Sequence, residues 1–205
     1  MARPLTPKLS PARIAKAALE LVDAHGEFTV PDLAKRLKVS PSSLYNHVDG
    51  KADIIELMRG QAVGAIALPD HSAGLDWAPV IREIAVQYRN SYARHPRLIP
   101  LLTAYSVRDE TTIRMYNVLA DQFVAAGFGP ARVLEAITVL DNFVLGSALD
   151  VAAPEEVWEP GEAATDSLRA ALAAGLGRER RADEAFEFGL DLIVAGLERA
   201  AAAGP

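Results

Sequence analysis

Apolar residues recur every three or four positions along most of this chain, which is the period of an α-helix. Val and Ile favour strands when they alternate with polar residues, but here they are scattered among Ala, Leu, Glu and Arg. With 205 residues, 50% of them hydrophobic, the chain is long enough to bury a substantial core. The sequence therefore predicts an all-α protein.

The first helix is signalled by the pair Ser10 and Pro11. A serine before a helix can accept a hydrogen bond from a free backbone N–H group, and proline suits the first helical turn. We predict this helix over residues 11–25, because Gly26 can then end it in the left-handed conformation.

Two shorter helices are predicted next, joined by a tight turn. Thr29 and Asp32 have the spacing of a capping box, which indicates a helix over residues 30–37. Ser40 precedes another proline and opens a helix expected over about 41–47. Two short helices joined by a turn of three or four residues have the geometry of a helix-turn-helix.

The rest of the chain is predicted to form helices separated by breaks rich in Pro and Gly. A long helix is expected to begin at residue 51, and further helices are expected over about 76–94, 98–105, 110–126, 131–152, 162–174 and 182–202. Residues 1–55 are therefore interpreted as a three-helix helix-turn-helix domain, and residues 56–205 as a larger helical domain.

Charge is distributed unevenly along the chain. The formal net charge of the whole sequence is −6, which by itself argues against a nucleic-acid partner. Residues 1–51, however, contain 8 Lys and Arg against 5 Asp and Glu, whereas the remainder contains 13 against 22. This asymmetry indicates a DNA-facing head on an acidic body.

The helix predicted over 41–47 has an unusual exposed side. Leu44 and Val48, four residues apart, are expected to hold one side of the segment against the core. A solvated helix face normally carries Glu and Lys, but the other side here consists of Ser42, Ser43, Tyr45, Asn46 and His47.

In the segment VSPSSLYNHVDGKADIIELM, a Val and a small cap precede Leu-Tyr, a basic or aromatic pair, another Val and a Lys that opens the next helix. This order resembles the tetracycline-repressor family over roughly residues 10–60. The resemblance implies that Tyr45, His47 and Lys51 contact phosphates and that residues 41–43 approach base edges. The predicted DNA-binding set is Thr29, Pro41, Ser42, Ser43, Tyr45, Asn46, His47 and Lys51.

Lys51 supports this interpretation, because a cation is disfavoured at the positive end of a helix unless an anion such as phosphate arrives. Taken alone, Tyr45 could equally be a half-buried amphipathic side chain, and His47 a residue near the negative end of its helix. Their occurrence in register with Leu44, Val48 and Lys51 favours DNA binding over these alternatives.

Two helices of the second half carry apolar residues on more than one side, so that each needs a second partner. Residues 131–151 form two apolar stripes, and residues 182–202 form a stripe beside small residues such as Gly189 and Gly196. We expect these two helices to build an intersubunit four-helix bundle about a two-fold axis, which makes the protein a homodimer. The stripe of the last helix is Phe186, Leu190, Ile193 and Leu197.

Residues 115–150, notably the run NFVLGSAL, also resemble the ligand-binding body of the tetracycline repressors. The resemblance implies a small-molecule pocket inside each subunit, with a polar ligand contact at Gln122, so residues 56–205 are expected to bind ligand as well as to dimerise. Each candidate has an ordinary core or surface residue as its alternative. The candidate ligand-binding residues are Tyr88, Tyr105, Tyr116, Gln122, Asp141 and Asn142.

The resemblance does not extend to the histidine with which the family's tetracycline binders hold a metal-chelated drug. Where the tetracycline binders place a histidine, this chain has Leu-Ile-Pro-Leu-Leu at residues 98–102. The four histidines lie far apart in the sequence, without a second ligand at metal-site spacing. We therefore expect neither a metal nor a cofactor.

Other chemistry finds little support. The absence of cysteine excludes disulfides and thiolate nucleophiles, and residues 127–129 lack the further glycine and the strand of a nucleotide loop. No stretch is long and apolar enough for a membrane span or a signal segment, so we expect a cytoplasmic location and no membrane partner. The sequence favours a repressor of operator DNA that an unidentified small molecule releases. A ligand-independent DNA-binding protein or a structural helical dimer is the nearer alternative, and an enzyme the more distant one.

Overall fold

The computed structural model describes residues 9–69, 76–154, 157–175 and 180–202. Every regular element in these ranges is helical, which confirms the predicted all-α fold. The elements are α1 (Pro11–His25), α2 (Val30–Leu37), α3 (Pro41–Leu44), α4 (Lys51–Val63), α5 (Trp77–Ala93), the 3-10 turn η2 (Pro96–Leu98), α6 (Ile99–Leu102), α7 (Glu110–Ala125), α8 (Pro130–Asp150), the 3-10 turn η3 (Gly161–Ala163), α9 (Asp166–Gly175) and α10 (Arg181–Ala202).

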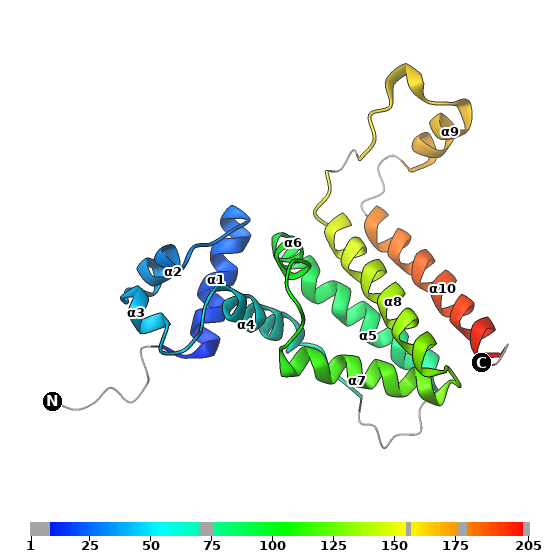
Figure 1. Ribbon diagram of the computed structural model, residues 1–205. Helices are drawn as coiled ribbons and strands as arrows, with labels where there is room; N and C mark the ends of the chain where they lie inside the picture. Colours follow the sequence, from blue (N-terminus) through cyan, green and yellow to red (C-terminus); the bar gives the residue numbers. More distant parts are fainter. Residues whose placement is uncertain (1–8, 70–75, 155–156, 176–179, 203–205) are drawn as a thin grey trace.

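The helices form two groups joined by α4. Figure 1 shows α1, α2 and α3, which we call the head, at one end of the molecule and α5 to α10, which we call the body, at the other. α4 packs against α1 of the head and against α5, α6 and α7 of the body. α8 and α10 lie side by side, and α9 projects beyond them on an arm (Figure 1).

The first two helices begin and end as their caps predict. The Oγ of Ser10 accepts a hydrogen bond from the N–H of Arg13, and Gly26 ends α1 with a φ of 80°. Thr29 accepts a hydrogen bond from the N–H of Asp32 at the start of α2. Because these signals are local, the predicted bounds of both helices are confirmed.

The third helix is shorter than predicted. α3 ends at Leu44, and the next residues form a tighter turn in which the N–H of His47 donates to the carbonyl of Leu44 at 2.8 Å. Tyr45, Asn46 and His47 are weak helix formers, so packing decides the conformation of this segment. The turn still brings Val48 into the core.

The short helix predicted over 98–105 begins earlier and ends earlier, as η2 followed by α6. Pro100 occupies the second position of α6, where its missing N–H group would have no partner in the helix. The helix predicted over 162–174 is replaced by η3 and α9.

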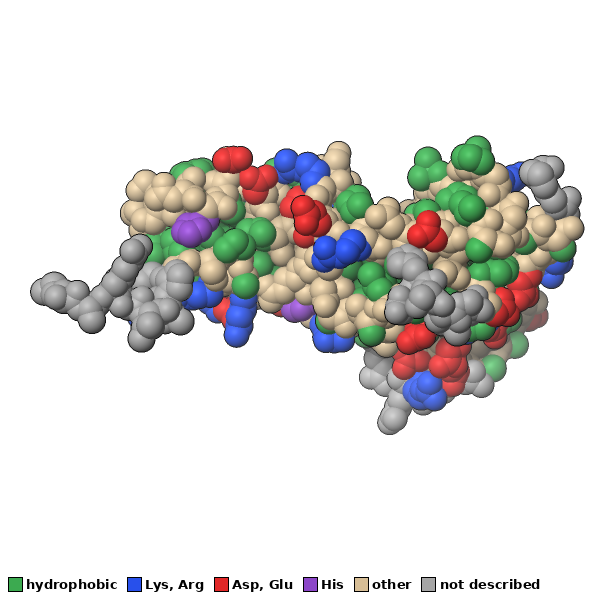
Figure 2. Space-filling view, turned by 90° about the horizontal axis from the view of Figure 1, so that it is seen from below, with side chains coloured by type: hydrophobic (Ala, Val, Ile, Leu, Met, Phe, Trp, Pro, Cys, Tyr) green, Lys and Arg blue, Asp and Glu red, His purple; other side chains and the backbone are tan. Residues whose placement is uncertain are grey.

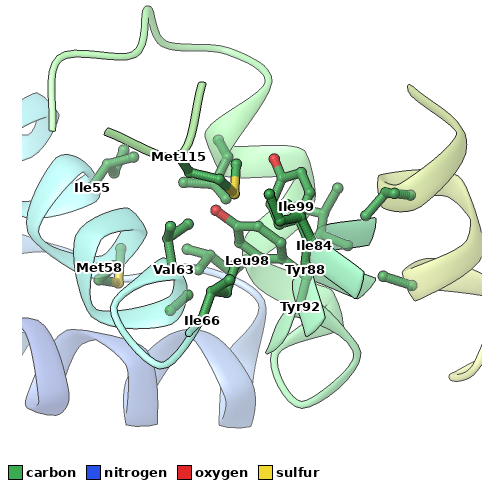
Figure 3. Close-up of a cluster of buried hydrophobic side chains, with 14 of the residues drawn as sticks. Ile55, Met58, Val63, Ile66, Ile84, Tyr88, Tyr92, Leu98, Ile99 and Met115 are labelled. Carbon is green, nitrogen blue, oxygen red and sulfur yellow. The ribbon is translucent and has the colours of Figure 1, made fainter. Parts of the chain in front are cut away.

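The apolar core continues from the head into the body through α4. Ile14 and Leu33 are fully buried in the head, as are Ile55 and Met58 on α4. Figure 3 shows Ile55 and Met58 in one cluster with side chains of the body, including Met115 of α7. A displacement of the body against α4 must therefore also disturb the packing of α4 against the head.

The expected division of the chain between residues 55 and 56 falls inside α4, which serves both groups. Among the described residues, no helix is long and apolar enough to cross a membrane.

Candidate nucleic-acid interface and effector site

The start of α3 carries a group of three serine hydroxyls. The Oγ of Ser40 accepts a hydrogen bond from the N–H of Ser43 at 3.2 Å, which caps the helix. The same Oγ lies 2.8 Å from the hydroxyl of Ser42 and 2.8 Å from that of Ser43. Because a hydroxyl both donates and accepts, this group can adapt to different polar partners.

The segment after α3 separates core residues from polar residues. Leu44 and Val48 are buried, as predicted, whereas the side chain of Tyr45 is 54% exposed. Asn46 and His47 are exposed as well. The structure therefore presents these three polar side chains together on the surface of the head, close in sequence to the exposed Ser42.

Lys51 is the first residue of α4, as predicted, and its side chain is exposed. The preceding Gly50 offers no side-chain cap, so the helix dipole acts on the ammonium group without a capping side chain between them. The Nζ atom lies 5.2 Å from the ring centre of Phe28, an attractive cation–π distance. The lysine side chain is thus held over the ring of Phe28, and in the sequence it follows the polar segment by four residues.

Thr29 has a structural role that accounts for its presence. It caps α2, and its hydroxyl also donates to the carboxylate of Asp32. The side chain is exposed, so a DNA contact remains a prediction.

The body contains a polar cluster that joins three helices. The hydroxyls of Tyr88 on α5 and Tyr116 on α7 both donate to the same Oδ1 atom of Asp141 on α8, at 2.7 Å and 2.9 Å. Burial raises the pKa of Tyr88, and the neighbouring Tyr116 raises it further, so the hydroxyl stays protonated as a donor. Three of the six predicted ligand-binding residues are therefore in contact.

The other three candidates lie outside this cluster. Tyr105, in the turn after α6, and Asn142, on the outer side of α8, are exposed. Gln122 is half-buried nearly two turns beyond Tyr116 on α7.

Tyr92 is a further polar residue of this region, which the sequence did not single out. Its ring meets that of Tyr88 edge to face, with 5.2 Å between the centres. Its hydroxyl is buried without a hydrogen-bond partner in the described structure. The spacing of four from Tyr88 on one helix was the available signal, because such residues share a face.

A buried ion pair connects α4 to the turn between α6 and α7. The Nε of Arg59 donates to Oε1 of Glu56 at 2.8 Å, and the Nη2 donates to the carbonyls of Leu102 and Tyr105, both at 3.1 Å. The other carboxylate oxygen of Glu56 accepts from two backbone N–H groups just before α7, at 2.6 Å and 2.9 Å.

Burial by itself raises the pKa of Glu56, but these hydrogen bonds and the nearby Arg59 outweigh burial and hold the pKa below its ordinary value of 4.5. The carboxylate is therefore charged at neutral pH. No motif marks this pair in the sequence, because its backbone partners are more than 40 residues away along the chain.

A second link joins the end of α1 to the body. The Nδ1 of His95 lies 2.8 Å from the carboxylate of Asp23. Nη1 of Arg97 donates to the carbonyls of Asp23 and Ala24, at 3.0 Å and 2.7 Å. Since the last carbonyls of a helix lack partners within it, the body completes the C-terminal end of α1.

The outer faces of α8 and α10 expose large apolar side chains. Leu134 and Leu149 on α8 are exposed, and on α10 Phe188 is 67% and Leu192 57% exposed. Such exposure on neighbouring helices is typical of a surface that another chain covers.

The apolar stripe predicted on the last helix faces inward rather than outward. Phe186 and Leu190 are buried within the chain. A Cβ atom at Gly189 would lie 2.6 Å from the ring of Phe143, so the small residue allows a close approach to α8 of the same chain. Periodicity found the stripe but could not say which neighbour it packs against.

Acidic side chains gather on the body in the view of Figure 2, as the uneven charge of the sequence predicts. Among the described residues, no group of three or more His, Asp or Glu side chains is arranged to hold a metal ion.

Comparison with known proteins places these features in context. Residues 68–201 match the family model described as tetracyclin repressor-like, C-terminal domain. The chain is 32% identical over 179 residues to a helix-turn-helix-type transcriptional regulator of Saccharopolyspora erythraea, covering 86% of this chain and 72% of the relative. It is 28% identical to the tetracycline repressor protein class G of Vibrio anguillarum, over 96% of this chain and 97% of that protein.

Solved structures share the fold. Apo ActR of Streptomyces coelicolor superposes with a TM-score of 0.78 at 21% identity, over 97% of this chain and 99% of that one. ActR has also been solved in complex with actinorhodin.

Proposed function

The chain belongs to the tetracycline-repressor family of transcriptional regulators, and on that premise we propose that it binds operator DNA as a homodimer and that a small molecule bound in the body lowers this affinity. The related proteins are regulators of transcription, and this supports a regulatory role for the chain. We expect it to act in the cytoplasm.

The observation that carries this proposal is the exposed polar segment that precedes Lys51 in the sequence. This segment lies on the head, which α4 joins to the body. Tyr45, His47 and Lys51 are proposed to contact phosphates, which position the head without reading sequence. Residues 41–43 are proposed to approach base edges from the start of α3. Thr29 and Asn46 complete the interface.

The effector is proposed to bind near the cluster of Tyr88, Tyr116 and Asp141, with Gln122 on the same helix as Tyr116. ActR with actinorhodin is a precedent for a small molecule in this fold. A ligand that separates α5, α7 and α8 would act on α4, which packs against α5 and α7. A coupling of about 1–3 kcal/mol is sufficient for a useful switch, and DNA must weaken ligand binding by the same factor.

The homodimer is proposed to form through α8 and α10, the helices predicted over residues 131–151 and 182–202. Their exposed apolar side chains supply the contact, and a two-fold axis would pair each face with its own copy. Two heads held by one rigid body can then read two half-sites of a palindrome.

The test of the proposal is binding to DNA from just upstream of the protein's own gene, with a footprint, followed by a compound screen for release. We expect a palindromic footprint and at least one compound that lowers operator affinity about fivefold or more. A compound that binds the body but leaves operator affinity unchanged argues for the ligand-independent alternative. A footprint without symmetry argues against a dimer that binds two half-sites of a palindrome.

The double variant Tyr45→Phe, Lys51→Ala is expected to bind operator and unrelated DNA about tenfold more weakly, because it loses phosphate contacts in both heads. Each lost phosphate contact also flattens the dependence of log affinity on log salt by about 0.9. Fluorescence anisotropy across a salt titration measures both quantities.

The control for this experiment is Arg114→Ala, an exposed arginine on α7, outside both the head and the proposed dimer face, whose Nη2 donates to the hydroxyl of Thr111 on the same helix at 3.1 Å. It removes one positive charge per subunit but should leave both quantities unchanged. Equal affinity of the double variant and the wild type at every salt concentration contradicts the phosphate assignment.

A further inference from the structure

Arg89 on α5 is a buried arginine that the proposed effector cluster does not use. The residue is only 5% exposed, and its Nη1 donates to Oδ1 of Asp183 on α10 at 2.7 Å. Its guanidinium lies over the ring of Phe186, 4.8 Å from the ring centre. That ring is stacked on Phe143 of α8, at 5.4 Å and an interplanar angle of 9°. The guanidinium thus ends an aromatic stack that spans α5, α10 and α8.

Two other nitrogens of Arg89 carry N–H donors that are not used. Its Nε and Nη2 are buried and have no hydrogen-bond partner within the described structure. Buried donors of a charged group are costly to leave unpaired, and native structures rarely do so without a reason. The packing of the helices alone therefore does not account for this side chain.

The two nitrogens without partners lie on one edge of the guanidinium group. Asp183 bonds to Nη1, whereas Nε and Nη2 point from the opposite edge of the planar group. This edge carries two parallel N–H bonds, the fork that a carboxylate accepts with both oxygens. A neutral carbonyl or hydroxyl group would satisfy only one of the two donors well.

A neighbouring arginine shows that holding α10 in place does not require such an arrangement. Arg82, seven residues earlier on α5, pairs with Asp191 of α10 at 2.6 Å, but both side chains are substantially exposed. Both ion pairs fasten α10 to α5. Of these two arginines, Arg89 is the one with a buried, unpartnered edge.

We propose that the Nε–Nη2 edge of Arg89 anchors a carboxylate of the effector, and that an aromatic part of the effector packs beside Phe186 and Phe143. This inference rests on the proposed ligand response and names the chemical class of the ligand: an aromatic carboxylic acid. Because both donors lie beneath the surface, the carboxylate reaches them only when the packing of α5 against α10 opens. Binding is thereby linked to a change in the helix that carries the proposed dimer face.

The test uses the full-length protein and three probes of increasing size: benzoate, 2-naphthoate and anthraquinone-2-carboxylate, each paired with its carboxamide. Calorimetry should show at least one carboxylate binding about tenfold or more tightly than its amide, since two charge-assisted hydrogen bonds distinguish them. Arg89→Met should remove that preference, and Arg89→Lys should restore little of it, because an ammonium lacks the fork. Arg82→Met, which removes the exposed ion pair, should keep the preference.

A carboxylate series that binds wild type no better than its amides overturns the inference, and so does an Arg89→Met variant that keeps the preference. If Arg89→Met fails to fold, Arg89→Lys and the carboxylate-against-amide comparison on wild type decide. Operator binding in the presence of each probe separates the two proposals. A carboxylate that binds through Arg89 without releasing DNA refutes the ligand response alone, whereas release by ligands whose binding is indifferent to Arg89 refutes the Arg89 anchor alone.

Discussion

Replacing Arg59 by methionine is expected to lower the free energy of unfolding by about 3–5 kcal/mol, because it removes one partner of a buried ion pair and leaves the other charge behind. The side chains of Arg59 and Glu56 are only 7% and 10% exposed. Without the guanidinium, Glu56 keeps its backbone donors before α7, but the carbonyls of Leu102, at the end of α6, and Tyr105, in the following turn, lose their shared donor. Methionine fills much of the space, so packing alone does not produce the loss.

Urea unfolding followed by circular dichroism measures this loss, and Arg108→Ala is the matched control. Arg108 also reaches α4, where it pairs with Asp53 at 2.9 Å, but its side chain is 59% exposed. Surface ion pairs contribute about 1 kcal/mol or less, so this variant should remain close to wild type. An Arg59→Met protein that is also within about 1 kcal/mol of wild type contradicts the proposed role of the buried pair.

The difference in the free energy of unfolding between wild type and Arg59→Met should become smaller at acidic pH. The pKa of Glu56 in the folded state lies below its ordinary value of 4.5. A lowered pKa stabilises the fold above the unfolded-state value, and this contribution is lost as the pH falls through the folded-state pKa. Unfolding measured at pH 7 and again below pH 4.5 tests the sign.

Replacing Phe188 by aspartate is expected to weaken dimerisation about 100-fold or more, because a two-fold axis places the change in the interface twice. The ring is 67% exposed in the single chain, on the outer face of α10, so the substitution should not disturb the core. A charge there would be desolvated when the second copy docks. Operator affinity should fall in parallel, since one head alone makes half of the contacts.

Analytical ultracentrifugation over a dilution series measures the dissociation constant. Val124→Asp is the control, because Val124 is 60% exposed on α7, a helix that is not part of the proposed interface. Val124→Asp should dimerise as wild type does. If Phe188→Asp also remains dimeric at the same concentrations, the outer face of α10 is not the interface.

Local signals in the sequence predicted the head well. The bounds of α1 and α2 follow from Ser10, Gly26 and Thr29, whose hydrogen bonds and backbone angles involve residues at most four positions away. The segment after α3 was predicted less well in length, since Tyr45 to His47 have weak preferences of their own and follow the packing of Leu44 and Val48.

The candidate site was predicted in part. Tyr88, Tyr116 and Asp141 were selected as separate polar residues in an apolar region, and the structure joins them through one carboxylate oxygen. Asn142, one position on from Asp141, turns outward instead. Composition identifies such residues as unusual, but only the rotation of each helix decides which of them meet.

The sequence by itself determined the helical class, the helix-turn-helix register and the family, because periodicity, capping and a local motif need only neighbours along the chain. Tertiary structure alone decided that Arg59 ties α4 to the turn before α7, that the stripe of Phe186 faces inward, and that Arg89 is buried with one edge unpaired. The physical reason is that burial and hydrogen-bond satisfaction depend on partners distant in the sequence. The sequence alone does not show whether a charged side chain will be exposed to water or buried in the core.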